Sequence, residues 1–335
     1  MKVLLANPRG FCAGVEMAID TVQELVDLIG TPLYVFHAIV HNKHVVERFV
    51  EQGVTFVERI DEVPEGETVV FSAHGVSPAV RAEAAARGLK MIDATCPLVT
   101  KVHVEARRYA RMGRHILLIG HADHQEVKGT LGEAPADTTV VESAADVAEL
   151  DFPPDQELIY LTQTTLSVDD AQTVIRAIEA RFPRCTAPPK EDICYATTNR
   201  QHAVMELASQ ADLTLVVGSA NSSNSVRLTE ISENRGTPGR LVDDASGLDP
   251  AWFEGVETVL LTAGASAPED LVEGVKRWLI ERFGAEVEDP EPVDEGMNFA
   301  LPVELRVMIN RGGGKPKTHR RRPEPTHAAT PGSDA

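Results

Sequence analysis

Three copies of one cysteine-centred pattern occur in the chain, and this repeat constrains the fold more than any other feature. Gly120 lies 24 residues after Cys96, and Gly218 lies 24 residues after Cys194. In both copies a helical stretch follows the cysteine, and an apolar strand runs up to the glycine. A third copy begins at Cys12, and its apolar strand ends 25 positions later. Self-similarity of this kind indicates repeated structural units.

The similarity continues beyond the first strand of each copy. A polar side chain follows that strand at 28 or 29 positions after the cysteine, namely His41, His124 and Ser222. A second apolar strand then runs into a turn that is rich in Gly, Ser or Thr, and a helical segment follows. The strand-and-turn segments are residues 68–75, 158–165 and 258–266, and the helical segments are residues 78–87, 168–181 and 268–283.

Strands that alternate with helices of this length predict parallel α/β sheets, whose ligands lie at the carboxyl ends of the strands. We therefore expect three similar α/β domains with parallel sheets, arranged with pseudo-threefold symmetry around a shared centre. The alternative is a coincidental spacing with inert core thiols. The expected units are residues 1–95, 96–193 and 194–284, a C-terminal extension at 285–310 that packs on the body, and a disordered tail at 311–335.

The C-terminal extension departs from the repeat. Residues 286–292 are expected to be a linker, and residues 297–306 one further strand laid over a domain. The segment from Arg311 onward is rich in Gly, Pro and basic residues, a composition typical of disorder. Its basic cluster could contact nucleic acid, but a solvated tail is the favoured interpretation.

The net charge and the cysteine content limit which partners and which cellular compartment are expected for the chain. A net charge of -19 argues against nucleic acid or an anionic membrane as the main partner, because both would repel the chain. Asn7, Pro8 and Arg9 interrupt the apolar start, so no signal peptide is expected. Four scattered cysteines without an export signal are typical of reduced thiols, metal ligands or catalytic groups. We expect a cytoplasmic protein.

Three converging thiols, from Cys12, Cys96 and Cys194, could hold a metal centre. Zinc sites usually contain a local Cys-x-x-Cys pair, and the chain has none. An iron–sulfur cluster with one cysteine from each unit fits better, since three ligands leave one iron open to substrate. Cys185 lies outside the repeat register in a Pro-rich connection and is interpreted as a bystander.

The segment at residues 120–126 places two imidazoles and two carboxylates directly after a strand. Glu126 is a candidate proton donor, with the imidazole of His124 beside it. The alternatives are a zinc site and a loop whose polar groups face water. The register of this segment with Cys96 favours the catalytic interpretation.

A candidate anion site lies at Ser222, Ser223 and Asn224, which begin a helix after a strand. Backbone N–H groups and short hydroxyls bind phosphate at such a place, although an ordinary capped turn looks the same in sequence. His41, His74 and Ser266 occupy equivalent strand ends in the repeat, so that one anionic ligand could be ringed by all of these side chains.

Eight motifs together resemble the LytB/IspH family of iron–sulfur reductases, and the resemblance covers about residues 1–310. They are PRGFCAGV (8–15), SAHGVS (72–77), DATCPLV (93–99), GHADHQE (120–126), QTTLS (163–167), DICYATTN (192–199), NSSNS (221–225) and TAGAS (262–266). The resemblance implies reduction of 4-hydroxy-3-methylbut-2-enyl diphosphate to isopentenyl and dimethylallyl diphosphate, by two-electron removal of a hydroxyl. This is the last step of the non-mevalonate (MEP/DXP) isoprenoid pathway.

The resemblance also assigns roles to residues. Cys12, Cys96 and Cys194 would hold one [4Fe–4S] cluster with an open iron, and reduced ferredoxin or flavodoxin would supply electrons. Glu126 would supply protons, while Thr164 and His124 position the substrate hydroxyl. The diphosphate would be held by His41, His74, Ser222, Ser223, Asn224 and Ser266.

One alternative function belongs to another class of protein. The chain could be a sensor or binding module in which an iron–sulfur cluster or a zinc ion is structural or senses redox state without turnover. Glu126 discriminates between the two functions, because a sensor has no need of a buried proton donor that faces the metal.

Overall fold

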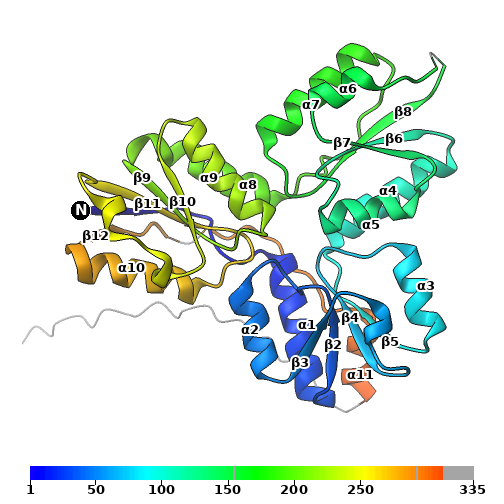
Figure 1. Ribbon diagram of the computed structural model, residues 1–335, viewed down its shortest axis with the longest axis horizontal. Coiled ribbons are helices and arrows are strands. Elements are labelled where there is room, and N and C mark those ends of the chain that lie inside the picture. The colour runs from blue at the N-terminus through cyan, green and yellow to red at the C-terminus, as the bar shows by residue number, and fades with distance from the viewer. Residues whose placement is uncertain (154, 292, 312–335) are drawn as a thin grey trace, which may run out of the picture.

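A computed structural model of the chain describes residues 1–153, 155–291 and 293–311. Three lobes surround a central region, and each lobe contains one parallel sheet flanked by helices (Figure 1). The first lobe contains β2 (Leu33–Phe36), β3 (Val54–Val57), β4 (Thr68–Phe71), β5 (Lys90–Asp93), α1 (Ala13–Ile29), α2 (Lys43–Glu51), α3 (Pro78–Ala86) and α11 (Val303–Arg311). The expected three α/β units with parallel sheets are confirmed.

The second and third lobes repeat this plan. The second contains β6 (His115–Ile119), β7 (Thr138–Val141), β8 (Leu158–Thr162), α4 (Pro97–Arg111), α5 (Gln125–Glu133), α6 (Ala144–Glu149) and α7 (Val168–Arg181). The third contains β1 (Lys2–Leu5), β9 (Leu213–Val217), β10 (Gly239–Val242), β11 (Thr258–Ala263), β12 (Glu286–Glu288), α8 (Tyr195–Leu207), α9 (Ser223–Asn234) and α10 (Glu269–Phe283).

Three strands in each sheet share one arrangement. The orders are β3-β2-β4-β5, β7-β6-β8 and β10-β9-β11-β1-β12, so the first repeat strand (β2, β6 or β9) always lies between the second and the third. Strands such as β9 are buried at every residue, as expected for parallel strands covered on both faces. In the described ranges, α2, α3, α6, α7 and α9 each start at a Ser or Asn whose side chain accepts a backbone N–H, as Asn42 does from Val45 and Ser167 from Asp170.

In each lobe, the chain passes beside β4, β8 or β11, the third strand of that repeat, before it enters the next lobe. In the first lobe it does so as β5, which leads to Cys96 and then to α4 of the second lobe. In the second lobe Thr186 forms a single parallel bridge with Ile159 of β8, and the chain then reaches Cys194 and α8 of the third lobe. Each such cysteine therefore lies at a junction between lobes.

The third lobe closes this cycle with the N-terminal strand. β1 pairs in parallel with β11 and β12, and the chain then passes through Cys12 into α1 of the first lobe. The expected first domain at residues 1–95 is therefore wrong at its start. Val3 and Leu5 are buried in the third lobe's core, which supplies the apolar contacts that hold the strand there.

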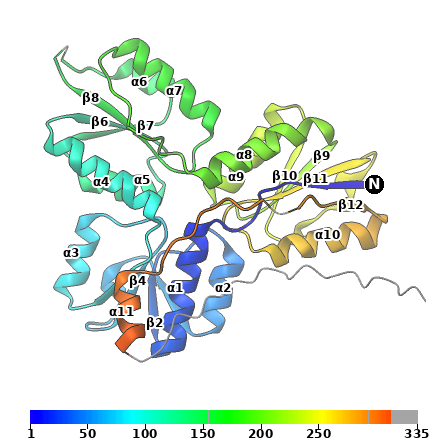
Figure 2. The same cartoon turned by 180° about the vertical axis from the view of Figure 1, so that it is seen from behind.

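The C-terminal extension also differs from the expectation. Residues 286–288 of the expected linker form β12. The strand expected at residues 297–306 is absent, since residues 297–302 form neither helix nor strand and residues 303–311 form a helix. Leu305 and Ile309, four residues apart, are buried in the first lobe's core, and this spacing suits a helix face. Arg311 ends that helix, so it is not part of a tail, and residues 312–335 lie outside the described residues. Figure 2 shows the segment crossing from the third lobe to the first beside the N-terminal strand.

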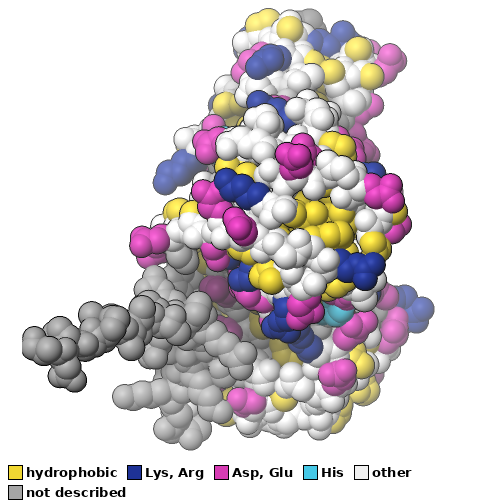
Figure 3. Space-filling view, turned by 90° about the vertical axis from the view of Figure 1, so that its left-hand side faces the viewer, with side chains coloured by type: hydrophobic (Ala, Val, Ile, Leu, Met, Phe, Trp, Pro, Cys, Tyr) yellow, Lys and Arg dark blue, Asp and Glu magenta, His cyan; other side chains and the backbone are white. Residues whose placement is uncertain are grey.

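The surface agrees with the excess of acidic residues. On the face shown in Figure 3, Asp and Glu side chains are scattered among Lys and Arg. None of the helices in the described ranges is both long enough and apolar enough to cross a membrane.

Candidate active site

Cys12, Cys96 and Cys194 occupy the same position in the three lobes. Each is the N-cap residue of the helix that follows it, α1, α4 or α8. The free N–H groups of a helix N-terminus point towards such a residue and favour negative charge on it. At Cys194 the sulfur accepts hydrogen bonds from the Thr197 backbone N–H at 3.4 Å and contacts the Thr197 hydroxyl at 3.2 Å.

The three thiols line one central cavity. Gly14 provides the space between two of them, because a Cβ at that position would lie 2.6 Å from the sulfur of Cys96 and 3.9 Å from that of Cys12. Burial raises the pKa of Cys12, and raises the pKa of Cys96 to about 12 and that of Cys194 to about 11. A thiolate in this place therefore needs a cation to balance its charge. Within the described ranges no three His, Cys, Asp or Glu side chains are grouped to hold a single metal ion.

Three histidines form a second group in the central cavity. The rings of His41 and His74 stack with centroids 3.8 Å apart, and the ring of His124 meets them edge-on at 5.4 and 6.2 Å. Burial lowers the pKa of His41 and of His124 to about 4, and lowers the pKa of His74 well below its ordinary value. These imidazoles are therefore neutral near pH 7 in the absence of an anion.

Two of these histidines have unused hydrogen-bonding atoms among the described residues. Both ring nitrogens of His41 and the Nε2 atom of His124 are buried without a partner. The Nδ1 atom of His124 accepts the backbone N–H of Glu126 at 3.2 Å, so a neutral His124 carries its proton on Nε2. Buried polar atoms without partners are costly, and a polar ligand in the cavity would satisfy them.

Glu126 lies in the first turn of α5 and is buried. Its Oε2 atom accepts hydrogen bonds from the Thr164 backbone N–H at 3.0 Å and from the Thr164 hydroxyl at 2.9 Å. Burial raises the pKa of Glu126 above its ordinary value, although both of these hydrogen bonds oppose the change. A carboxyl whose pKa is raised in this way keeps its proton at higher pH, as a general acid requires.

Short polar side chains from the third lobe also line the cavity. Ser222 is the N-cap of α9, and its oxygen accepts hydrogen bonds from the Ser225 backbone N–H at 3.3 Å and from the hydroxyls of Ser225 and Ser266 at 3.0 and 3.4 Å. The Ser266 hydroxyl also contacts the His41 carbonyl at 2.9 Å, which links the third lobe to the first. The N-terminus of α9 therefore faces the cavity beside hydroxyl groups, an arrangement that suits phosphate oxygens.

Ser223 and Asn224 follow in the first turn of α9. The Ser223 hydroxyl donates to the Thr165 carbonyl at 3.1 Å. The Asn224 side chain accepts the Ala265 N–H at 3.0 Å and donates to the Thr197 hydroxyl at 3.4 Å. Thr197 also contacts Cys194, so the Asn224 amide connects the N-terminus of α9 to one of the thiols.

The structure brings all twelve site residues expected from sequence into the central cavity. They are Cys12, His41, His74, Cys96, His124, Glu126, Thr164, Cys194, Ser222, Ser223, Asn224 and Ser266. The roles of these residues remain predictions, because proximity does not assign them.

Sequence reasoning missed other residues that line the cavity. These are Gly14, Val15, Val40, Ala73, Val99, Thr165, Thr197 and Ala265. Thr197 had a readable signal, because a Thr three residues after a helix N-cap lies within reach of the capping side chain. The apolar residues carried none, since their pattern is that of any core position.

Cys185 does not line the central cavity. It packs at the edge of a core cluster in the second lobe, and its thiol lies 3.8 Å from the Thr186 carbonyl. Its interpretation as a bystander remains a prediction.

Comparisons with known proteins agree on one family. The family model described as LytB protein matches residues 3–280. A 4-hydroxy-3-methylbut-2-enyl diphosphate reductase from Pseudomonas aeruginosa (strain LESB58) is 53% identical over 311 residues, which cover 92% of this chain and 99% of the relative. A reductase of the same name from Azoarcus sp. (strain BH72) is 54% identical over 305 residues, covering 91% and 98%.

Two solved structures are similar along most of their length. The E-1-hydroxy-2-methyl-but-2-enyl-4-diphosphate reductase from Plasmodium falciparum has a TM-score of 0.90 and 40% identity, covering 93% of this chain and 99% of that one. A second structure, described as (E)-4-hydroxy-3-methyl-but-2-enyl diphosphate reductase, the terminal enzyme of the non-mevalonate pathway, has a TM-score of 0.60 and 33% identity, covering 84% and 100%.

Proposed function

This chain belongs to the LytB protein family, and on that premise we propose that its central cavity reduces 4-hydroxy-3-methylbut-2-enyl diphosphate. The reaction takes up two electrons and two protons, breaks the bond between the allylic carbon and the hydroxyl, and releases water. The products are isopentenyl and dimethylallyl diphosphate, and the step is the terminal one of the non-mevalonate pathway. The observation that carries the proposal is a buried carboxyl, Glu126, in the same cavity as three thiols from three lobes.

The residues fit an iron–sulfur cluster. Cys12, Cys96 and Cys194 each stand at a helix N-terminus, and Gly14 leaves free the space beside two of the sulfurs. We propose that these three thiolates hold one [4Fe–4S] cluster, whose fourth iron has no protein ligand. When bound, the cluster supplies electrons and an open Lewis-acidic position for the substrate hydroxyl.

The diphosphate is held at the wall formed by the histidines and the N-terminus of α9. The proposed ligands are His41, His74, Ser222, Ser223, Asn224 and Ser266. An anion between these groups raises the pKa of the neighbouring imidazoles, because opposite charge favours the charged form. It also supplies acceptors for the buried His41 nitrogens that have no partner among the described residues.

Proton transfer is assigned to Glu126. Thr164 holds its Oε2 atom through two hydrogen bonds, so the other oxygen, Oε1, is left to carry the proton. His124 presents Nε2–H to the substrate hydroxyl, and together with Thr164 it orients that hydroxyl for departure as water. Burial favours the protonated form of Glu126 by raising its pKa. After giving one proton to the departing hydroxyl, the carboxyl must take up another before it supplies the proton that the allylic carbon gains.

The remaining partners are also part of the proposal. Reduced ferredoxin or flavodoxin supplies the electrons, and nucleic acid and membranes are not partners of this acidic chain. Reduced thiols persist in the cytoplasm, so the reaction is assigned to that compartment.

Anaerobic turnover tests the proposal directly. Full-length protein with its metal content measured is incubated with 4-hydroxy-3-methylbut-2-enyl diphosphate and a low-potential chemical reductant, and the diphosphate products are separated and weighed by mass spectrometry. Loss of one oxygen from the substrate, dependent on both iron and reductant, supports the proposal. Brown protein that binds the substrate and leaves it intact would identify a sensor or binding module instead.

A further inference from the structure

Arg200 is the largest side chain that is completely buried in the described part of the chain, and the chemistry described above does not use it. It lies on α8, six residues after Cys194. A guanidinium keeps its charge in proteins and carries five N–H donors, so its burial requires a full set of acceptors.

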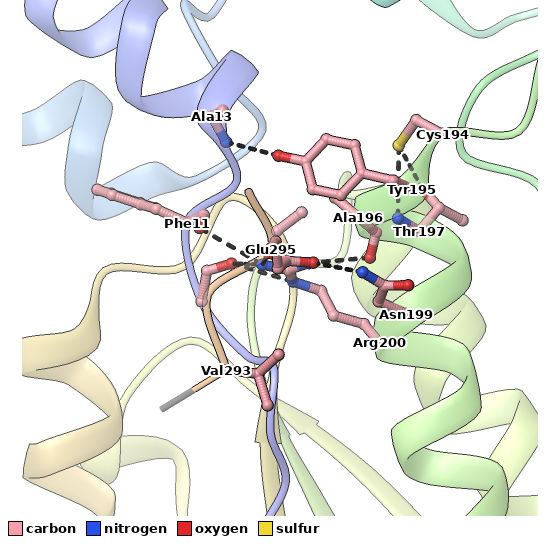
Figure 4. Close-up of polar contacts among 12 residues, drawn as sticks. Phe11, Ala13, Cys194, Tyr195, Ala196, Thr197, Asn199, Arg200, Val293 and Glu295 are labelled. Carbon is pink, nitrogen blue, oxygen red and sulfur yellow. Dashed lines mark hydrogen bonds and ion pairs between the residues drawn. The ribbon is translucent and has the colours of Figure 1, made fainter. Parts of the chain in front are cut away.

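The acceptors of Arg200 lie on the loop that leads to Cys12. The Gly10 carbonyl accepts hydrogen bonds from Nε at 3.1 Å and from Nη2 at 2.8 Å, and the Phe11 carbonyl accepts one at 3.4 Å (Figure 4). The Ala196 carbonyl, in the first turn of α8, accepts from Nη1 at 2.9 Å. The guanidinium therefore joins the backbone just before Cys12 to the helix that begins after Cys194.

A second contact holds the chain on the other side of Cys12. The Ala13 backbone N–H donates to the Tyr195 hydroxyl at 3.1 Å, and Tyr195 directly follows Cys194 (Figure 4). Residues before and after Cys12 are thus both bonded to α8. The relative position of Cys12 and Cys194 is determined by these bonds as well as by anything bound between the thiols.

The carboxylate that balances Arg200 comes from the C-terminal segment. Glu295 pairs with Nη1 and Nη2 of Arg200, each at 3.2 Å, and also accepts the Asn199 amide at 2.9 Å. Its side chain is only 14% exposed. Without this carboxylate the buried guanidinium would have no counter-charge at this contact, which is a costly arrangement.

The segment that carries Glu295 is fixed at both ends. β12 pairs with β1 in the third lobe, and α11 buries Leu305 and Ile309 in the first lobe. Glu295 lies in the chain between these two anchors. This connecting segment passes from one lobe to the other (Figure 2).

We propose that Glu295 is a positioning residue that acts through Arg200 to lock the Cys12 loop onto α8. The lock keeps Cys12 and Cys194 at a fixed separation, and it makes the C-terminal segment part of the support of the site. The inference rests on the proposed function only in taking these two cysteines as cluster ligands.

Hydrogen exchange in the full-length chain tests the lock without any turnover. Glu295→Gln keeps the size of the side chain and removes its charge. The amides of residues 11–14 should then exchange about tenfold faster or more, because local opening frees the loop from α8. Peptides from β6 to β8 in the second lobe should exchange as in the wild type. Glu288→Gln is the matched control. Glu288 is on the same C-terminal segment as Glu295, and its loss breaks only an exposed ion pair with Lys2, so exchange at residues 11–14 should not change.

Two further measurements separate positioning from general damage. Asn199→Ala removes a single donor to Glu295. It should therefore accelerate exchange at residues 11–14 by a smaller factor than Glu295→Gln does. In metal-loaded protein, release of iron to a chelator should be faster in Glu295→Gln than in Glu288→Gln, with both melting temperatures within a few degrees of wild type.

Unchanged exchange at residues 11–14 in Glu295→Gln overturns the lock, and so does an acceleration spread evenly over all three lobes. Neither result depends on catalysis. An inactive wild-type protein with normal protection at residues 11–14 would contradict the proposed function and leave the lock intact.

Discussion

Thr164 donates two hydrogen bonds to the same oxygen of Glu126, one from its backbone N–H at 3.0 Å and one from its hydroxyl at 2.9 Å. The two residues come from different elements, since Glu126 lies in α5 and Thr164 follows β8. The contact fixes the orientation of the carboxyl, and it stabilises the charged form against the burial that favours the neutral one.

Glu126→Gln keeps the shape of the side chain and removes its ionisable proton. Turnover should fall by roughly 10²–10⁴-fold, the usual contribution of a positioned acid or base, while iron content and substrate binding persist. Single-turnover kinetics and substrate titration measure both quantities. Glu149→Gln, on the exposed surface of α6, is the matched control and should retain normal turnover. Turnover of Glu126→Gln within a few-fold of wild type would falsify the assignment of Glu126 as the acid.

Thr164→Val tests how the hydroxyl tunes Glu126. Valine keeps the shape and the backbone N–H but removes the hydroxyl bond to the carboxylate. Loss of a bond to the charged form raises the pKa of Glu126 further. A general acid is active while protonated, so activity that declines as pH rises through this pKa should persist to higher pH in the variant. The pH dependence of kcat measures the shift, and a displacement of that limb to lower pH would contradict the argument.

The four cysteines should divide into two classes. Cys12→Ser, Cys96→Ser and Cys194→Ser should each lose the cluster, because a serine replaces a thiolate ligand. Cys185→Ser should keep iron content and turnover near normal, because Cys185 lies outside the central cavity. Iron analysis and the visible spectrum of anaerobic protein decide this. A Cys185→Ser variant that is as colourless as the other three would show that the three-cysteine site is wrong.

Gly14→Ala should damage the metal site while the fold persists. The added Cβ would lie 2.6 Å from the Cys96 sulfur, so that sulfur must move. Gly274→Ala is a control of the same chemistry, because Gly274 is in α10 and a Cβ there meets nothing within 4 Å. Alanine at 274 should stabilise the helix by about 1 kcal/mol. Iron content and thermal unfolding compare the two variants, and normal iron content in Gly14→Ala would contradict the close approach.

The repeat in the sequence was sufficient to predict the parallel sheets and the common centre. Apolar strands that end at matched distances from Cys12, Cys96 and Cys194 each place a polar residue at a strand's carboxyl end, and parallel strands bring those ends to one edge. For this reason all twelve predicted site residues lie around one cavity. The helical segment predicted at residues 168–181 from the repeat has these bounds in the structure, where the Ser167 side chain caps its N-terminus.

The sequence could not determine which lobe each connecting segment joins. Lys2–Leu5 is a short, mostly apolar run whose sequence does not indicate a pairing partner. It pairs with β11 on one side and β12 on the other, and Val3 and Leu5 are buried in the third lobe's core. Residues 297–306 were expected to be a strand, yet residues 303–311 form a helix because Leu305 and Ile309 pack together against the first lobe. The role of Arg200 was equally invisible, since its acceptors at Gly10 and Phe11 and its carboxylate at Glu295 are distant in the chain. Local sequence pattern therefore determined the repeating units and the residues of the site. Long-range strand pairing and burial decided how the units close into a cycle and what holds Cys12 in place, because both depend on surfaces that form only in the folded chain.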